Sequence, residues 1–97
     1  MNAVETLEAH AAELRALGAR RIGVFGSRAR GEERPDSDVD VFVELEETKR
    51  TFGGFNDLYE FLEGLFNAKI DLVTDKALSE RWAKRILPTV KYATLDR

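Results

Sequence analysis

Hydrophobic and polar residues recur along this chain with two different periods, and each period predicts one kind of secondary structure. Steps of three and four residues predict helices, whereas alternation or a short apolar run predicts strands. A first amphipathic helix is predicted from Val4 to Leu17, and Gly18 can end it in a left-handed conformation. A helix from Leu78 to Leu87 is stopped by Pro88. Between them, another helix has its apolar face at Phe55, Leu58, Tyr59, Leu62, Leu65 and Phe66.

Three segments have the pattern of β-strands. RIGVF, residues 21–25, is short and β-rich, as expected of a strand buried on both faces. VDVFVE, residues 39–44, alternates strictly, and KIDLV, residues 69–73, places Asp71 on the face opposite Ile70 and Leu72. VKYAT near the end is either a short strand or a loose tail.

The order of these elements predicts one α/β (α+β) domain spanning residues 1–97. A small sheet is expected to be covered by helices, while the directions of the strands are left open by the pattern. With 97 residues, the chain is large enough for one hydrophobic core. A separate domain for a second substrate would not fit.

Composition and charge narrow the class of protein. The net charge of −3 argues against a partner that is a long nucleic acid, because such binding depends on many phosphate contacts. Lysines and arginines are nevertheless concentrated around residues 20–34 and 76–91, so a few phosphates could be held. The chain has no cysteine and no apolar run of about 20 residues, the length needed to span a membrane. A cytoplasmic protein without a membrane partner is therefore expected.

Two aspartates, Asp38 and Asp40, lie at the beginning of the strand predicted at residues 39–44. Asp40 lies on the face opposite the three valines, and Asp38 shares that face if the strand begins one residue earlier. Carboxylates two positions apart can converge on a hard cation such as Mg²⁺, which prefers oxygen ligands. Taken alone, the Asp-x-Asp pattern is more typical of turn and strand-edge residues in a solvated loop.

A Gly-Ser pair precedes these aspartates by ten residues. Gly26 lets a phosphate approach the backbone at the end of a strand, and Ser27 can begin a short helix with free N–H groups. Arg28 and Arg30 follow immediately. An ordinary strand-to-helix turn capped by Ser27 is the alternative, but the combination with Asp38 favours a site for a metal-bound phosphate.

In these residues the chain resembles the minimal nucleotidyltransferases, which are relatives of the polymerase β-like superfamily. The resemblance implies the nucleotidyltransferase fold, with a small mixed sheet, and extends to the later strand aspartate in KIDLV. It spans most of the chain, since the smallest members of the family have about this length. The matching residues are Gly26, Ser27, Arg30, Gly31, Ser37, Asp38, Asp40 and Asp71.

The resemblance implies an enzyme that transfers a nucleoside monophosphate from ATP or another NTP to a hydroxyl group and releases pyrophosphate. Asp38 and Asp40 would bind two Mg²⁺ ions. Asp71 would complete the metal site and help to take the proton of the acceptor. Such chemistry depends mainly on positioning and charge stabilisation, which paired metals supply. The triphosphate would be held or neutralised by Gly26, Ser27, and Arg28 or Arg30.

The resemblance also implies a partner. Minimal nucleotidyltransferases are often antitoxins paired with a HEPN-domain toxin, so the expected reaction is AMPylation of a tyrosine on that toxin. The alternative is a non-catalytic antitoxin that neutralises its partner stoichiometrically. An RNA-binding module fits the basic C-terminal quarter but not the acidic net charge. The preferred base, the acceptor and the oligomeric state are left open.

Three aromatic residues have no place in this chemistry. Trp82 lies in a helix rich in arginine and lysine, where it is expected to be a core anchor, with a stacking platform for a base as the alternative. Phe52 and Phe55 flank two glycines. They are expected to tuck into the core, with a partner contact as the alternative.

Overall fold

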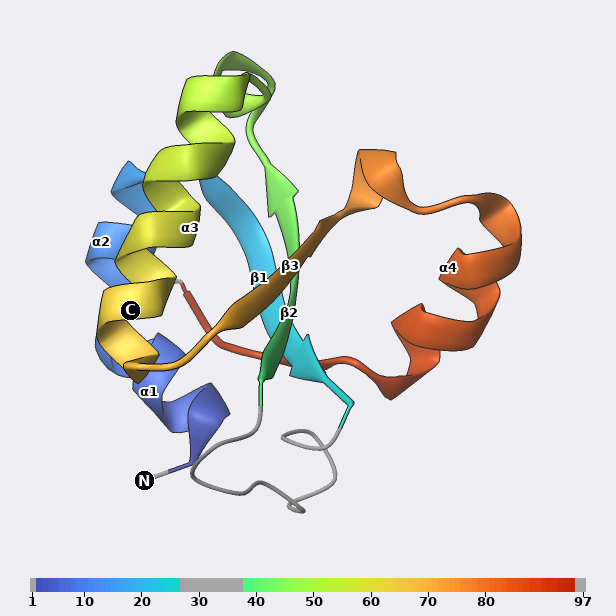
Figure 1. Ribbon diagram of the computed structural model, residues 1–97, viewed down its shortest axis with the longest axis horizontal. Helices are drawn as coiled ribbons and strands as arrows, with labels where there is room; N and C mark the ends of the chain where they lie inside the picture. Colours follow the sequence, from blue (N-terminus) through green and yellow to red (C-terminus); the bar gives the residue numbers. More distant parts are fainter. Residues whose placement is uncertain (1, 27–37, 96–97) are drawn as a thin grey trace.

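The computed structural model describes residues 2–26 and 38–95, and these form a four-stranded sheet with helices on both faces (Figure 1). The strand order is β3-β2-β1-β4, and the sheet is mixed: β2 and β3 are parallel, while β1 is antiparallel to both β2 and β4. The predicted α/β class is confirmed. The strands are β1 (Ala19–Phe25), β2 (Val39–Leu45), β3 (Ile70–Thr74) and β4 (Lys91–Tyr92). The helices are α1 (Ala3–Ala9), α2 (Ala11–Ala16), α3 (Phe52–Phe66) and α4 (Glu80–Ile86).

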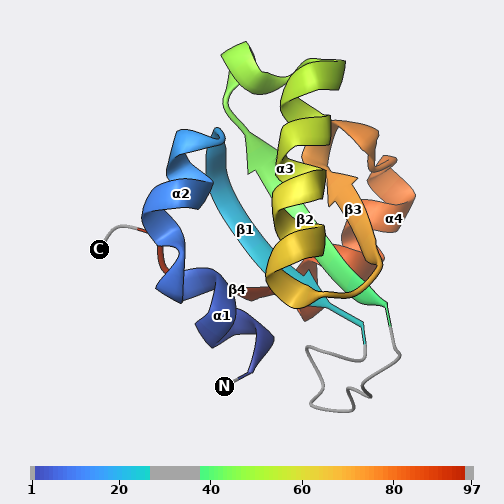
Figure 2. The ribbon, with the colours of Figure 1, turned by 60° about the vertical axis from the view of Figure 1, so that its left-hand side comes forward.

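One face of the sheet is covered by α1, α2 and α3, as Figures 1 and 2 show from two directions. The valines of β2 point into this layer and are fully buried, as the alternating pattern predicts. Leu58 and Leu62 of α3 meet them there, together with Leu7 and Leu14 from the first two helices. This layer is the main hydrophobic core.

The opposite face carries Asp40, Phe42 and Glu44 of β2, and only part of it is covered. Phe42 is 1% exposed, and the ring of Tyr92 packs edge-on against it at 6.3 Å between centroids. At Gly23 the returning chain passes so close that an added Cβ would lie 2.6 Å from the carbonyl oxygen of Lys91. We call this second side the open face of the sheet, and α4 lies on its side of the molecule (Figure 1).

The N-terminal helix is divided, which the sequence pattern did not predict. His10 separates α1 from α2 with φ −117° and ψ 29°, outside the helical region, and its N–H donates to the carbonyl of Leu7 at 3.0 Å. That shorter-range hydrogen bond ends the first segment. Gly18 adopts φ +95°, the left-handed conformation that was expected at the end of the second segment.

Two other boundaries differ from the prediction. The helix α3 starts at Phe52 because the side chain of Thr51 accepts a hydrogen bond from the N–H of Gly54 and caps it. The helix α4 is shorter than expected, because Ser79 caps its start at Glu80 and Leu87 already belongs to a separate 3-10 turn, Leu87–Thr89. In the part of the chain that is described, no helix has the length and apolar character needed to cross a bilayer.

Candidate active site at the start of β2 and β3

Two of the predicted site residues, Asp38 and Asp40, lie where β2 begins. The strand begins at Val39, whose N–H donates to the carbonyl of Lys69 at 2.9 Å and thereby fixes the start of the pairing with β3. Asp38 lies immediately before the strand and is exposed. Because Val39 and Val41 are buried in the core, the side chain of Asp40 between them must point to the open face.

Asp71 lies directly beside Asp40. The two residues are register partners in the parallel pair of β2 and β3, so their Cα atoms are roughly 4.8 Å apart across the strands. Ile70 and Leu72 pack toward the core, which turns Asp71 to the open face as the sequence pattern predicted. The fold therefore brings together two carboxylates that are 31 positions apart in the chain.

Gly26 lies on the other side of Asp40. It follows Phe25, the partner of Asp40 in the antiparallel pair of β1 and β2, and it adopts φ +70°. A Cβ added at Gly26 would lie 3.2 Å from Cγ of Asp40 and closer still to Oδ2. Glycine is favoured here both by the left-handed backbone and by the carboxylate beside it.

Three of the predicted phosphate-binding residues, Ser27, Arg28 and Arg30, lie outside the described residues. Within residues 2–26 and 38–95, no group of three acidic or histidine side chains is close enough to hold a metal ion. The structure thus joins Asp40 to Asp71 and to Gly26 but does not gather all three aspartates. Adjacent carboxylate oxygens do fit the chemistry of Mg²⁺, which usually takes one or two carboxylates and completes its shell with water and substrate phosphate.

A polar cluster further along the open face was not anticipated. The guanidinium of Arg21 donates to the carboxylate of Glu44 and, at 3.0 Å, to the hydroxyl of Tyr92, while it also lies 4.2 Å from the centre of the Tyr92 ring. These contacts tie β4 to the two central strands. The alternation of β2 had placed Glu44 on this face, but nothing in the sequence indicated that Arg21 would bind both Glu44 and Tyr92.

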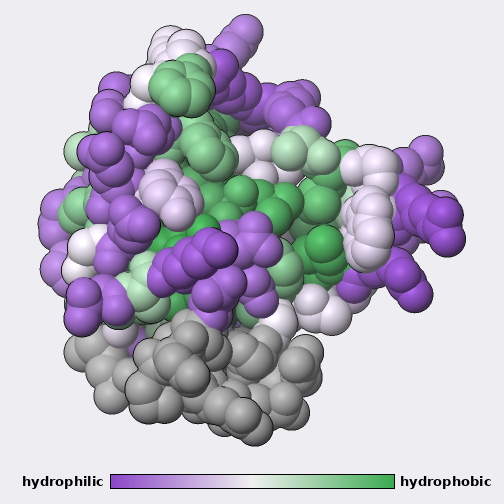
Figure 3. All heavy atoms as spheres, viewed as in Figure 1, coloured by the Kyte–Doolittle hydropathy of each residue, from purple (hydrophilic) through white to green (hydrophobic). Residues whose placement is uncertain are grey.

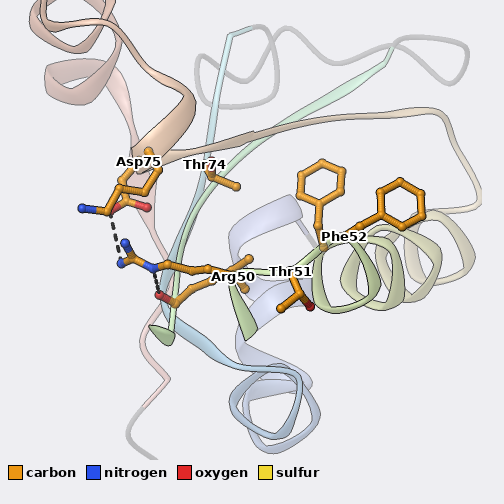
Figure 4. Close-up of a pocket in the computed structure, with 8 residues that line it drawn as sticks. Arg50, Thr51, Phe52, Thr74 and Asp75 are labelled. Carbon is orange, nitrogen blue, oxygen red and sulfur yellow. Dashed lines mark hydrogen bonds and ion pairs between the residues drawn. The ribbon is translucent and has the colours of Figure 1, made fainter. Parts of the chain in front are cut away.

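A pocket of about 310 Å³ lies at the opposite ends of β2 and β3 (Figure 4). Arg50 closes one side of it, donating to the carbonyl of Leu45 at 2.8 Å and pairing with Asp75 at 3.5 Å. Leu45 is five positions beyond Asp40 on the same strand, roughly 17 Å away. The pocket is therefore separate from the aspartates.

The aromatic residues outside the site are less buried than the sequence suggested. Phe52 lines that pocket and is 87% exposed, and Trp82 is 53% exposed. The expectation of core positions for these two residues is wrong. Phe55 is partly buried and also lines the pocket.

The known proteins to which this chain is similar are nucleotidyltransferases. The nucleotidyltransferase domain family model matches residues 7–96. The chain is 46% identical over 87 residues to protein adenylyltransferase MntA of Thermococcus cleftensis, covering 89% of this chain and 87% of that protein. It is 37% identical over 67 residues to a protein of Methanocaldococcus jannaschii provisionally named a protein adenylyltransferase, covering 68% of this chain and 67% of that one.

Solved structures have the same architecture. One, provisionally described as a minimal nucleotidyltransferase, superposes with a TM-score of 0.77 at 38% identity and covers 94% of this chain and 95% of the other. A second, described as a toxin–antitoxin with AMP-PNP, has a TM-score of 0.73 at 20% identity and covers 95% of this chain and 74% of the other. At 20% identity, this second match shows that the two proteins share a fold.

Proposed function

This chain belongs to the nucleotidyltransferase domain family, and we propose that it is an Mg²⁺-dependent protein adenylyltransferase acting as an antitoxin in the cytoplasm. It moves AMP from ATP to a tyrosine hydroxyl of a HEPN-domain toxin. The adenylyl group and the protein acceptor are supported by the name of the Thermococcus cleftensis relative. The description of the second solved structure motivates a toxin as the acceptor.

One observation carries the proposal: Asp40 lies between Gly26 and Asp71 on the open face of the sheet. Because Gly26 has no side chain, a phosphate can approach the backbone beside the first carboxylate. The second carboxylate stands on the next strand, where an acceptor hydroxyl can reach it. A phosphate site and a carboxylate for the acceptor are what nucleotidyl transfer needs.

In the reaction, the acceptor oxygen attacks the α-phosphorus of the NTP. The bond from that phosphorus to the oxygen bridging to the β-phosphate breaks, and pyrophosphate leaves with the electron pair. Asp71 accepts the hydroxyl proton, while Gly26 and Ser27 hold the triphosphate. Asp38, Asp40 and Asp71 are the residues that would hold Mg²⁺, which when bound supplies positive charge to the attacking and leaving oxygens.

The test is to incubate the purified chain with Mg²⁺ and ATP, together with lysate of its own cell. The ATP carries its label on the α-phosphate in one reaction and on the γ-phosphate in a second. Transfer of AMP labels a protein from the α-position only. Labelled GTP, CTP and UTP tested in parallel report the base preference.

The variant for this test is Asp38→Asn with Asp40→Asn, and its matched control is Asp57→Asn, an exposed aspartate on α3. The double variant should lose the label while the control keeps it. Label that survives the double substitution would overturn the mechanism. If no protein is labelled by the wild type, but wild type and double variant retain the same partner, stoichiometric neutralisation becomes the better account.

A further inference from the structure

The helix α4, Glu80–Ile86, is not buried by the rest of the chain, and we call it the α4 arm. It lies on the open-face side, away from α1, α2 and α3, and none of its seven residues is buried. Ser79 caps it, so the arm is a formed helix. Its exposed tryptophan, Trp82, is therefore not explained by packing within the chain.

The arm is basic in an acidic protein. Helix α4 contains Arg81, Lys84 and Arg85 against Glu80, a net charge of +2, whereas the whole chain carries −3. Figure 3 shows hydrophilic side chains at the outer edge of α4 and apolar atoms between α4 and the sheet. A surface of this kind attracts an acidic partner and repels a basic one.

Trp82 and Arg85 are arranged as a contact pair. The guanidinium of Arg85 lies 5.7 Å from the centre of the Trp82 ring, and Arg81 and Lys84 are exposed on the same short helix. Tryptophan and arginine are the residue types that most often dominate binding energy at protein interfaces. The pair thus offers an aromatic surface together with positive charge.

The chain that follows α4 returns to the strand next to Asp40. From α4 the chain passes through the turn Leu87–Thr89 into β4, where Lys91 pairs with Val24, one residue from Phe25. Phe25 is the strand partner of Asp40. A protein held on α4 would therefore lie on the same side of the sheet as Asp40 (Figure 1).

We propose that the α4 arm, formed by Arg81, Trp82, Lys84 and Arg85, docks an acidic, tyrosine-bearing segment of the acceptor protein. This inference rests on the proposed function for the identity of the bound segment as an acceptor. The docking itself is independent of transfer, because none of these four residues belongs to the site at Asp40. RNA is the competing occupant of a basic aromatic surface.

Trp82 makes the docking directly measurable, since it is the only tryptophan in the chain. The full chain is titrated with a synthetic tyrosine peptide rich in aspartate and glutamate, and Trp82 emission is followed. A lysine-rich peptide with the same tyrosine and an unstructured RNA oligonucleotide are titrated in parallel. We expect a saturable change in emission with the acidic peptide only, weakened by added salt.

The variant for this experiment is Arg81→Glu with Arg85→Glu, which keeps Trp82 as the reporter. Its matched control is Arg15→Glu with Arg20→Glu, since these exposed arginines lie on α2 and β1 and the net charge changes equally. The α4 variant should bind the acidic peptide on the order of tenfold more weakly, and the control should bind within about twofold of the wild type. Melting curves verify that both variants are folded.

Equal weakening by the two double variants would overturn the docking surface, as would equal binding of the acidic and basic peptides or tighter binding of RNA. The absence of any change in Trp82 emission would overturn it as well. Transfer from α-labelled ATP to the bound acidic peptide is measured separately. If the peptide binds through α4 and no transfer occurs to any acceptor, the proposed function fails while the docking surface stands.

Discussion

Gly26→Ala is the substitution that best distinguishes an effect on the geometry of the site from an effect on the stability of the fold. Gly26 has φ +70°, and the new methyl group would lie 3.2 Å from Cγ of Asp40 and closer to Oδ2. Non-bonded atoms normally keep roughly 3.5–4.0 Å. The carboxylate must therefore rotate away, because it is the end of a side chain and the strand backbone is fixed by its pairing with Asp71.

The added methyl group should lower both the stability of the protein and its activity, by different amounts. The left-handed backbone costs an L-residue roughly 1–2 kcal/mol, and each kcal/mol lowers the melting temperature of a domain this small by about 4–8 °C. The cost to activity is larger, because a displacement of about 1 Å in a reacting group can reduce the rate about 100-fold. We expect AMP transfer to fall about 100-fold at a temperature where the protein is still folded.

The assay is the initial rate of label transfer from α-labelled ATP, with melting followed by circular dichroism. The matched control is Gly64→Ala, because Gly64 lies within α3 and an added Cβ there would meet no atom within 4 Å. This control should gain about 0.5–1 kcal/mol of stability and keep full activity. Transfer by the Gly26 variant within about threefold of the wild type would refute the role given to the contact with Asp40.

Three further substitutions test the account of the fold. Phe42→Ala should lower the free energy of unfolding by about 3–5 kcal/mol, because the ring is buried against Tyr92; a loss below about 1 kcal/mol in urea unfolding would contradict that packing. Thr51→Ala removes the N-cap of α3 and should cost about 1 kcal/mol by the same measurement, and no loss would mean that the cap is idle. The hydrogen bond with His10 lowers the pKa of Glu13 below its ordinary value. The contribution of this hydrogen bond to stability is therefore present above the unfolded-state pKa and is lost as the pH falls through the folded-state pKa. Glu13→Gln should therefore make melting temperature less dependent on pH in that acidic range, and an unchanged dependence would contradict the role of the bond.

The alternation of β2 made much of the site predictable from the sequence. Val39 and Val41 are strongly apolar neighbours, so their burial fixes the direction of Asp40 between them. In KIDLV, the apolar neighbours Ile70 and Leu72 fix the direction of Asp71 in the same way. What the pattern could not give is that β2 and β3 are parallel neighbours in register, because pairing depends on contacts between distant segments.

The aromatic residues show the limit of reading burial from residue type. Phe52 and Trp82 are large and apolar, yet each lies in the first turn of its helix, close to the capping residue, and is exposed. Hydrophobicity alone predicts that such residues are inside, whereas their position in the helix decides what they can reach. The break at His10 was missed for a related reason, since apolar spacing continues across it.

The central claim is that the carboxylates at the start of β2 serve transfer of a nucleotide to a protein. The most direct measurement is the intact mass of the acceptor protein after incubation with this chain, Mg²⁺ and ATP, with Asp38→Asn and Asp40→Asn as the comparison. The account predicts that the acceptor gains the mass of one or more AMP groups with the wild type and none with the double variant. An acceptor whose mass does not change, or changes equally with both proteins, would contradict it.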